Sequence, residues 1–520
     1  MTRSVLTRGA LVAAGAGLYG LAMPPVDRPE LAWLTLVPLL VAIRGCTLRV
    51  ALGLGALWGL VASWAVTWWL VPAVAHYFRI GIAPAAAAMS VAYVLALSCT
   101  AGPFAAAAAW FLRRTSPPVA TLAIPALWVV AELVRARGLS DPWALLGYTQ
   151  HANVGLIQVA AVTGVYGVSF IVALGNAALA EAIARMWAGR PFADAARVLG
   201  APATVIASLW LVGAAALPPP STEPELHPVA VVQTNVPPAY EWTRGYAERQ
   251  LAEHLGATAR LLRDIHPALV VWPENALTLY YEHEPMVARQ LRTVARSAAI
   301  DLLFGAPRHA DGRTFNSARL VTRTGYDTAT YDKQRLVPFA EMSPLASPVP
   351  AAAAETPEHF TAGTTAGVLP AFVPTGVSIC HEILYPDVIE ASVRAGAELL
   401  VNIANDGWLD GGTGFASRQH FAMAALRAVE TRRYVVRAAT TGISGVIDPY
   451  GRVLATQATA TAGIVTASVA ARGEMTPYVL AGDAFGLTCA LAIPLLAAAG
   501  SRRRTSVPQL APAPVAIAAR

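Results

Sequence analysis

Cys380 has a reactive side chain, and its position in the sequence is one in which a cysteine could act in catalysis. It ends the short apolar segment 376–379, and the sequence Tyr385-Pro386-Asp387 soon opens a helix. A cysteine at a strand-to-helix turn is expected at the exposed edge of a sheet, where the following backbone N–H groups can bind an oxyanion. In that interpretation Cys380 is a nucleophile. The alternative, from this segment alone, is a buried strand cysteine.

A glutamate and a lysine lie in two further segments of this kind. Glu274 follows the apolar residues 270–273, a setting that packing explains poorly and that suits a general base. Lys333 follows the strand-like residues 328–331 in a chain where lysines are scarce. A lysine near a thiol favours the thiolate and can neutralise a tetrahedral oxyanion. Taken singly, the two residues also fit a solvated carboxylate and a surface lysine.

The three residues together form a more specific pattern than any one of them. Glu274, Lys333 and Cys380 follow one another in that order, and each lies at the end of an expected strand. A base, a cation and a thiol in these settings predict that Cys380 acts as a catalytic nucleophile.

The elements that must position these residues are those of an α/β domain. Short apolar segments of the β type recur between residues 228 and 470, and helical patterns lie between them, which favours alternating strands and helices. The expected strands are 229–233, 268–272, 301–304, 376–379 and 399–403, and the expected helices are 246–265, 285–298 and 415–432.

The rest of the chain has the composition of a membrane protein. Of its 520 residues, 55% are hydrophobic and 13% are charged, and the mean hydropathy is +0.49. A soluble domain carries about 25% charged residues. The net charge of +6 comes from arginines in short clusters between apolar runs, without a basic and aromatic module, so no nucleic-acid partner is expected.

The cysteines indicate neither a metal site nor a disulfide framework. Only four are present, and no pair has the spacing of metal ligands. Cys46, Cys99 and Cys489 lie inside apolar runs, where a cysteine usually behaves as a small buried hydrophobe. No metal and no cofactor is expected.

Eight apolar stretches predict about eight transmembrane helices, because a helix needs about 20 apolar residues to cross a bilayer. They lie at about 6–24, 30–44, 48–72, 81–112, 118–136, 155–184, 197–217 and 477–500, of which the second and fifth are short. The expected organisation is a membrane domain over 1–217, a catalytic domain over 228–470, a terminal helix over 477–500 and a disordered tail over 505–520. A cleaved signal peptide is the alternative for the first stretch, but no small-residue cleavage site precedes Pro24-Pro25.

Arginine placement predicts the orientation, because cytoplasmic loops carry an excess of basic residues. With a cytoplasmic N-terminus, the cytoplasmic loops hold the arginines at 44, 49, 113, 114, 185, 190 and 197, and the tail holds those at 502–504. The opposite loops carry fewer arginines. Seven crossings then put the catalytic domain outside the cytoplasm.

The motifs around the three reactive residues resemble those of the nitrilase, or carbon–nitrogen hydrolase, superfamily, whose triad is Glu-Lys-Cys. The matching segments are VWPE at 271–274, YDKQRLVPFAE at 331–341 and ICHE at 379–382. This resemblance implies an α-β-β-α sandwich.

Over about residues 5 to 500 the chain resembles the apolipoprotein N-acyltransferase family, in which such a domain stands between seven apolar helices and one terminal helix. Further matching segments are PW at 142–143, GYTQ at 147–150, GVYGVS at 164–169, VVQTN at 231–235, NDGW at 405–408, QH at 419–420 and TPY at 476–478.

The resemblance implies the last step of bacterial lipoprotein maturation. A phospholipid would donate an acyl group to Cys380, and the α-amine of an apolipoprotein's diacylglyceryl-cysteine would accept it, in ping-pong order. Lys333 and the backbone N–H at His381 would hold the oxyanion. Glu341 would support the site, and so would Glu382, for which a helix N-terminal acid fits equally well. The location implied is the bacterial cytoplasmic (inner) membrane, with a periplasmic catalytic domain.

Substrate contacts are expected from aromatic residues. Trp242, Trp272 and Trp408 are candidates for the lipid entrance, because indoles favour the membrane interface, although Trp272 also fits core packing. Tyr148, on the loop after the fifth helix, is expected to contact lipid. His381 replaces a frequent Tyr of the family, and residues 409–410, Leu-Asp, replace its Phe-Gly, so the shape of the acyl-binding wall is left open.

Two other functions fit part of the pattern. A membrane-anchored amidase or nitrilase would use the same triad with water as acceptor, but a hydrolase of soluble substrates needs no bundle of apolar helices. A lipid transporter or a catalytically dead scaffold is the second alternative. Transporters usually carry ionisable groups within their spans, and here only Glu132 and Glu181, near helix ends, stand out.

Overall fold

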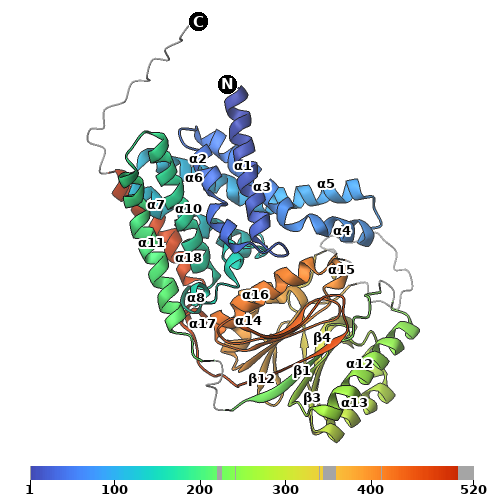
Figure 1. Ribbon diagram of the computed structural model, residues 1–520. Helices are drawn as coiled ribbons and strands as arrows, with labels where there is room; N and C mark the ends of the chain where they lie inside the picture. Colours follow the sequence, from blue (N-terminus) through green and yellow to red (C-terminus); the bar gives the residue numbers. More distant parts are fainter. Residues whose placement is uncertain are drawn as a thin grey trace, which may run out of the picture.

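The computed structural model describes residues 2–219, 225–239, 242–338, 340–342, 359–410 and 413–501. A bundle of helices stands on a domain of two sheets, and the helices at both ends of the chain belong to the bundle (Figure 1). The expected tail and the arginines at 502–504 lie outside the described residues.

The bundle is built from apolar helices, several of them short. Its helices are α1 (Thr2–Ala22), α2 (Val37–Ala42), α3 (Leu48–Thr67), α4 (Val71–Tyr77), α5 (Ile82–Tyr93), α6 (Cys99–Arg114), α7 (Pro117–Leu133), α8 (Val154–Ile157), α9 (Ala160–Thr163), α10 (Val165–Trp187), α11 (Phe192–Ala215), α17 (Pro477–Ala481) and α18 (Ala484–Ser501). The terminal α18 returns to pack against α7.

Within the described residues, five helical segments are long and apolar enough to cross a membrane. They cover Leu48–His76, Ile82–Arg114, Pro117–Gly138, Val165–Trp187 and Phe192–Ala215. The apolar helices Pro29–Ala42, Val154–Thr163 and Ala484–Gly500 are shorter. The chain is therefore a multi-pass membrane protein by its helices, whereas the expected count of eight crossings is not confirmed.

Prolines and a glycine explain why two expected crossings are interrupted. Residues 30–44 form a 3-10 helix, Pro29–Leu34, and the short α2, and each begins with a proline in its first turn. Proline lacks an N–H and therefore starts helices rather than continuing them. The stretch 155–184 is broken at Gly164, whose φ of 64° closes α9 before α10 begins.

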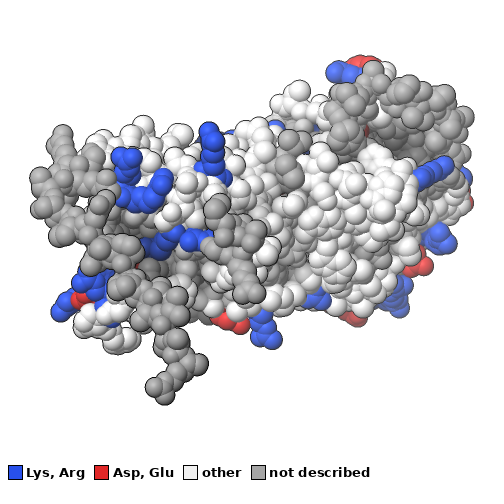
Figure 2. Space-filling model, turned by 90° about the horizontal axis from the view of Figure 1, so that it is seen from above, with Lys and Arg blue, Asp and Glu red and all other residues white. Residues whose placement is uncertain are grey.

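Basic residues gather at the end of the bundle that lies away from the sheets. The N-terminus and the α10–α11 connection lie at that end (Figure 1). Glu181 on α10 accepts hydrogen bonds from Arg44 and Arg185, at 2.6 and 2.9 Å. Seen from this end, arginine side chains cluster on part of the surface, and much of the rest carries no charge (Figure 2). This arrangement agrees with the charge asymmetry expected of cytoplasmic loops.

The second domain contains two six-stranded sheets. The first has the order β12-β1-β2-β3-β4-β5 and the second β11-β10-β9-β8-β7-β6. The strands are β1 (His227–Gln233), β2 (Leu269–Val271), β3 (Asp301–Ala310), β4 (Arg313–Val321), β5 (Asp327–Asp332), β6 (Val368–Pro370), β7 (Pro374–Ile379), β8 (Leu399–Ala404), β9 (Val435–Ala439), β10 (Ser444–Ile447), β11 (Val453–Gln457) and β12 (Gly463–Val469).

Alternate side chains of a strand pack into different layers of the domain. In β1, Val229 and Val231 pack into the core between the two sheets, whereas Ala230 and Val232 face the helices outside the first sheet. Successive side chains of a strand point to opposite faces, so a strand that is apolar throughout is buried on both. The result is the α-β-β-α sandwich implied by the nitrilase resemblance.

Helices cover the outer face of each sheet. The first sheet is covered by α12 (Arg244–Asp264) and α13 (Pro285–Ala298), and α14 (Pro386–Arg394) and α16 (Phe415–Thr431) pack in one apolar cluster with the membrane helices. The short α15 (Gly407–Asp410) contacts α4 and lies close beneath it (Figure 1). The catalytic domain thus meets the bundle through helices α14 to α16.

Polar side chains on α16 fix this contact. Gln419 donates to the carbonyl oxygens of Pro24 and Val66, at 2.8 and 3.0 Å, and accepts from Trp143 Nε1 at 2.6 Å. Buried polar groups in such a contact need partners, so these bonds specify one docked arrangement.

Candidate active site

The three expected reactive residues each follow a strand. Glu274 follows β2 of the first sheet, Lys333 directly follows β5 of the same sheet, and Cys380 directly follows β7 of the second sheet. All three side chains are buried between the layers.

Lys333 lies between two carboxylates. Its Nζ atom is 3.3 Å from Oε1 of Glu274 and 2.8 Å from Oε1 of Glu341. Burial alone would lower the pKa of Lys333, but Glu274 and then Glu341 raise it well above its ordinary value. The lysine therefore remains a cation in the folded protein.

Glu274 is held at both carboxylate oxygens. Oε1 accepts from Asn316 Nδ2 at 2.7 Å, and Oε2 accepts from the backbone N–H of Asn405 at 2.9 Å. Asn316, on β4, also donates to Glu341 Oε1 at 2.9 Å. These bonds offset part of the cost of burying a carboxylate and fix its orientation.

Cys380 is fully buried, with 0% of its surface exposed, so the expectation that it lies exposed at a sheet edge is wrong. Its φ of 57° is a left-handed conformation that non-glycine residues adopt at a cost of about 1–3 kcal/mol. The carbonyl oxygen of Cys380 accepts from Asn402 Nδ2 at 3.2 Å, which helps hold this turn. Such strained turns are frequent where a nucleophile is presented.

The thiol of Cys380 is held in its protonated form. Burial raises the pKa of Cys380 well above its ordinary value, the charge of Glu274 raises it further, and Lys333 acts in the opposite direction. Lys333 favours the thiolate, as expected, but burial and Glu274 have the larger effect on the pKa of Cys380. A base must take the proton when the sulfur attacks.

Glu382 connects the turn of Cys380 with the loop of Lys333. Oε1 accepts from the backbone N–H groups of Gln334 and Arg335, at 2.6 and 3.0 Å, and Oε2 accepts from that of Ile379 at 2.7 Å. The hydroxyl of Tyr331 donates to the same carboxylate. Burial raises the pKa of Glu382 to about 7, and the backbone hydrogen bonds act against this rise. Glu382 thus lies in the first turn of the short helix Cys380–Leu384, as the alternative for this residue expected, and it also binds the loop of Lys333.

His381 is the unusual polar residue of the turn. Its side chain is buried, and neither ring nitrogen has a partner among the described residues. Burial, followed by the charge of Lys333, lowers the pKa of His381 well below its ordinary value. The imidazole is therefore neutral, and its ring packs edge-on against Tyr385 at 5.6 Å between centroids.

The four expected substrate contacts separate into two groups. Tyr148 is fully buried, and its hydroxyl accepts from Arg427 at 3.2 Å, so the expected contact with lipid is wrong. Trp272 is also fully buried: it donates to Thr258 Oγ1 at 3.0 Å and serves core packing. Trp242 and Trp408 are half-buried and remain candidates. Trp242 lines a pocket of about 340 Å³, and Trp408 packs beside Trp69 of the bundle.

Several polar residues of the site were not singled out from the sequence. Asn316, Asn402 and Arg437 lie on strands, and each is buried and hydrogen-bonded to a residue near the triad. Asp406 and His420, known only as parts of matching segments, form a buried pair at 2.8 Å. A polar residue inside a strand is the only sequence signal that could have drawn attention to the first three.

No group of three or more His, Cys, Asp or Glu side chains gathers as metal ligands within the described ranges. The arrangement of Glu274, Lys333 and Cys380 is suited to acyl transfer in which a base activates a thiol beside a fixed cation.

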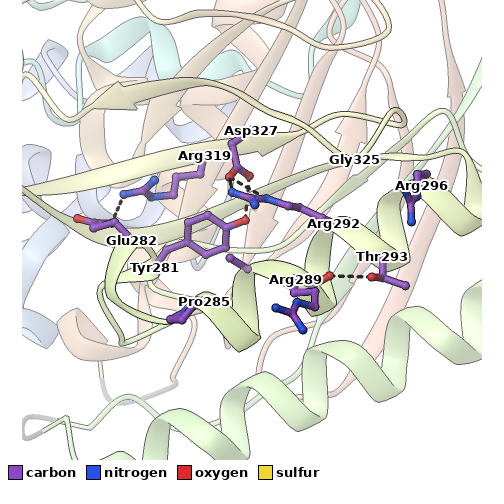
Figure 3. A pocket seen from close by; sticks show the side chains of 11 residues that line it. Tyr281, Glu282, Pro285, Arg289, Arg292, Thr293, Arg296, Arg319, Gly325 and Asp327 are labelled. Atoms are coloured by element: carbon purple, nitrogen blue, oxygen red, sulfur yellow. Dashed lines mark hydrogen bonds and ion pairs between the residues drawn. The ribbon is translucent and has the colours of Figure 1, made fainter.

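A separate pocket of about 600 Å³ lies on the outer side of the first sheet, over α13 (Figure 3). Arg292 pairs there with Asp327, and Arg319 pairs with Glu282. Neither the triad nor its supporting residues line this pocket.

Known proteins are similar to both parts of the chain. The apolipoprotein N-acyltransferase N-terminal domain matches residues 15–178, and the carbon-nitrogen hydrolase domain matches residues 228–478. The apolipoprotein N-acyltransferase of Geobacter metallireducens is 31% identical over 505 residues, covering 94% of each chain. That of Azotobacter vinelandii is 32% identical over 531 residues, covering 98% of each. Among solved structures, an amidase from Nesterenkonia sp. is 18% identical, with a TM-score of 0.37, and covers 50% of this chain and 94% of that chain.

Proposed function

The chain belongs to the apolipoprotein N-acyltransferase family, and from this premise we propose that Glu274, Lys333 and Cys380 transfer an acyl group from a phospholipid to an apolipoprotein. The acceptor is the α-amine of the N-terminal diacylglyceryl-cysteine. The observation that carries the proposal is Lys333, buried between Glu274 and Glu341 beside a buried thiol.

In the first half-reaction, Glu274 accepts the proton of the Cys380 thiol as the sulfur attacks the ester carbonyl. The new negative charge on the carbonyl oxygen is stabilised by Lys333 and by the backbone N–H at His381. One such donor contributes about 2.7–4 kcal/mol to lowering the barrier. The C–O bond then breaks, the proton passes from Glu274 to the departing alkoxide, and a lysophospholipid leaves a thioester on Cys380.

In the second half-reaction, the acceptor amine attacks the thioester. Glu274 accepts a proton from the attacking nitrogen and returns it to the sulfur as the C–S bond breaks. The products are an amide and the free thiol. One acyl-enzyme that serves two substrates in turn predicts ping-pong kinetics.

Glu341 and Glu382 support this site in different ways. Glu341 shares the ammonium of Lys333 with Glu274, and Glu382 fixes the turn of Cys380 against the loop of Lys333. Trp242 and Trp408 border the path of the acyl chains, since half-buried indoles favour the membrane interface.

The enzyme works in the bacterial inner membrane with its catalytic domain on the periplasmic side. The arginines at the far end of the bundle support this orientation. Both substrates are held in the bilayer by acyl chains, so a catalytic domain docked on a membrane bundle can reach them without removing them from the lipid.

The test is acyl transfer in vesicles that contain the protein, phosphatidylethanolamine with a labelled acyl chain, and a diacylglyceryl-cysteine peptide. The proposal predicts label in an amide on the peptide and one lysophospholipid for each amide. Release of labelled fatty acid without labelled peptide would instead identify a hydrolase that uses the same triad.

A further inference from the structure

Asp406 and His420 form an acid–base pair beside the proposed triad. Nδ1 of His420, on α16, is 2.8 Å from Oδ1 of Asp406, and Oδ2 of Asp406 accepts from Arg437 Nη2 at 2.6 Å. All three side chains are fully buried. A carboxylate can only accept a hydrogen bond, so Nδ1 of the imidazole carries the proton and Nε2 presents a lone pair.

The Nε2 atom of His420 is buried and has no partner in the part of the chain that the structure describes. Buried polar atoms normally have a partner, and one without it needs an explanation. A position that a reacting group occupies during turnover provides that explanation.

The pair links the proposed base to the membrane side of the site. Asn405, next to Asp406, donates its N–H to Glu274. The imidazole of His420 packs on Trp143 at 4.9 Å between ring centroids. Trp143 belongs to the bundle and lines a mostly apolar cavity of about 240 Å³ among the membrane helices.

The charges around His420 suit a neutral base at rest. Burial lowers the pKa of His420, Asp406 raises it, Arg437 lowers it, and Glu274 raises it, with a net value below the ordinary one. A positive charge on His420 would lower the pKa of His381, in the turn of Cys380, still further. Burial alone would raise the pKa of Asp406, but Arg437 and His420 lower it below its ordinary value.

The proton balance of the second half-reaction requires a base in addition to Glu274. An α-amine has an ordinary pKa of about 7.7–8.0, so at pH 7 the acceptor arrives mostly as an ammonium. An ammonium and a thioester give an amide, a thiol and one proton in excess. Glu274 returns one proton to the sulfur of Cys380. The other proton must leave the nitrogen before it can attack.

On the basis of the proposed function, we propose that His420 Nε2 takes this excess proton from the acceptor ammonium, while Asp406 stabilises the imidazolium that forms. The proton then passes to solvent after the amide product leaves. The first half-reaction has no excess proton and does not need His420.

The experiment measures the two half-reactions separately in His420→Asn, whose amide nitrogen can keep the hydrogen bond to Asp406. The expected result is formation of the Cys380 thioester within a few-fold of the wild-type rate. Discharge to a diacylglyceryl-cysteine peptide at pH 7 should be slower by about 10²-fold or more, the usual contribution of a general base. The deficit should shrink towards about pH 9, where the amine arrives neutral. Hydroxylamine, which is neutral at pH 7, should discharge the variant at the wild-type rate.

His254→Asn is the matched control. His254 is also buried, packs on a tryptophan and bonds through Nδ1, and its Nε2 has no partner among the described residues. It lies in the outer layer on α12. It should leave both half-reactions and their pH profiles unchanged.

Three results would overturn the proposal: unchanged peptide discharge in His420→Asn, discharge slowed equally at every pH and with hydroxylamine, or loss of thioester formation in both His420→Asn and His420→Gln. Failure of the wild-type protein to form a thioester would instead contradict the proposed function.

Discussion

The Nζ atom of Lys333 lies 3.3 Å from Oε1 of Glu274, and both side chains are almost completely buried. Lys333 is also the only lysine of the 520 residues. A buried ion pair costs several kcal/mol of desolvation for each ion, which only close geometry and further hydrogen bonds offset. Here Glu341 and Asn316 supply those bonds, which offset part of this cost.

Replacing Lys333 should affect both stability and activity. Lys333→Met leaves two buried carboxylates without their cation, so the free energy of unfolding should fall by about 3–5 kcal/mol, and thioester formation should be lost. Urea unfolding in detergent measures the first effect. Arg308→Met is the control, because Arg308 pairs with Asp332 at a partly exposed site and should cost about 1 kcal/mol or less. A Lys333→Met protein as stable as wild type would contradict the described charge arrangement.

The raised pKa of Cys380 predicts how the thiol reacts with pH. Thiolate forms only as pH approaches the thiol pKa, so a raised value moves reactivity to higher pH. The rate of modification by methyl methanethiosulfonate should be low at pH 7 and should still be rising at pH 9. The adduct on Cys380 can be followed by mass spectrometry, with Cys380→Ala as the blank. A rate that reaches its plateau below pH 7 would show a resting thiolate instead.

Glu382 should matter although it is not proposed to contact substrate. Glu382→Ala removes the acceptor of the buried N–H of Ile379 and of the partly buried N–H groups of Gln334 and Arg335, and a buried unsatisfied group costs about 1–3 kcal/mol. We expect a lower melting temperature and a lower kcat with little change in KM. Glu390→Ala, a buried glutamate of α14 that pairs with Arg394, is the control and should keep kcat. An equal loss of kcat in both variants would indicate general destabilisation rather than loss of this connection.

A variant of Tyr148 can show whether this residue serves a structural contact or a contact with lipid. Its hydroxyl accepts from Arg427, which also bonds to Glu430 at 2.9 Å within the contact between the two domains. Tyr148→Phe should lower stability by about 1 kcal/mol, the usual contribution of one hydrogen bond, and leave the KM for phospholipid unchanged. A several-fold rise in that KM at unchanged stability would instead indicate that Tyr148 contacts the phospholipid.

The strands that the sequence predicts best are mainly apolar. The predicted bounds of β1, β2, β7 and β8 agree with the structure within two residues at each end, although Ser378 and Asn402 lie inside β7 and β8. β9 was not expected, because Arg437 interrupts its apolar run. In the fold Arg437 is fully buried, and its charge is paired with Asp406 across the sheet. Such a pairing between distant segments cannot be read from either segment alone.

In the site, too, some features can be predicted from single segments and others depend on distant parts of the chain. Glu274, Lys333 and Cys380 each stand in a distinctive segment, and the strands bring them to one buried region. For Cys380 the segment alone leaves two positions open, an exposed sheet edge and a buried strand end. In the structure Cys380 is buried among strand residues of both sheets, which come from other parts of the chain. The role of Glu382 also depends on distant partners, since three of its four donors come from the segment 331–335.

Acyl transfer through a thioester on Cys380 is tested most directly by intact mass spectrometry of the detergent-purified protein after incubation with phosphatidylethanolamine. We expect one added acyl group on the wild-type protein, its removal by hydroxylamine or by a diacylglyceryl-cysteine peptide, and no adduct on Cys380→Ala. If the wild-type protein gains no acyl group, or if Cys380→Ala gains one as readily, then acyl transfer does not pass through a thioester on Cys380.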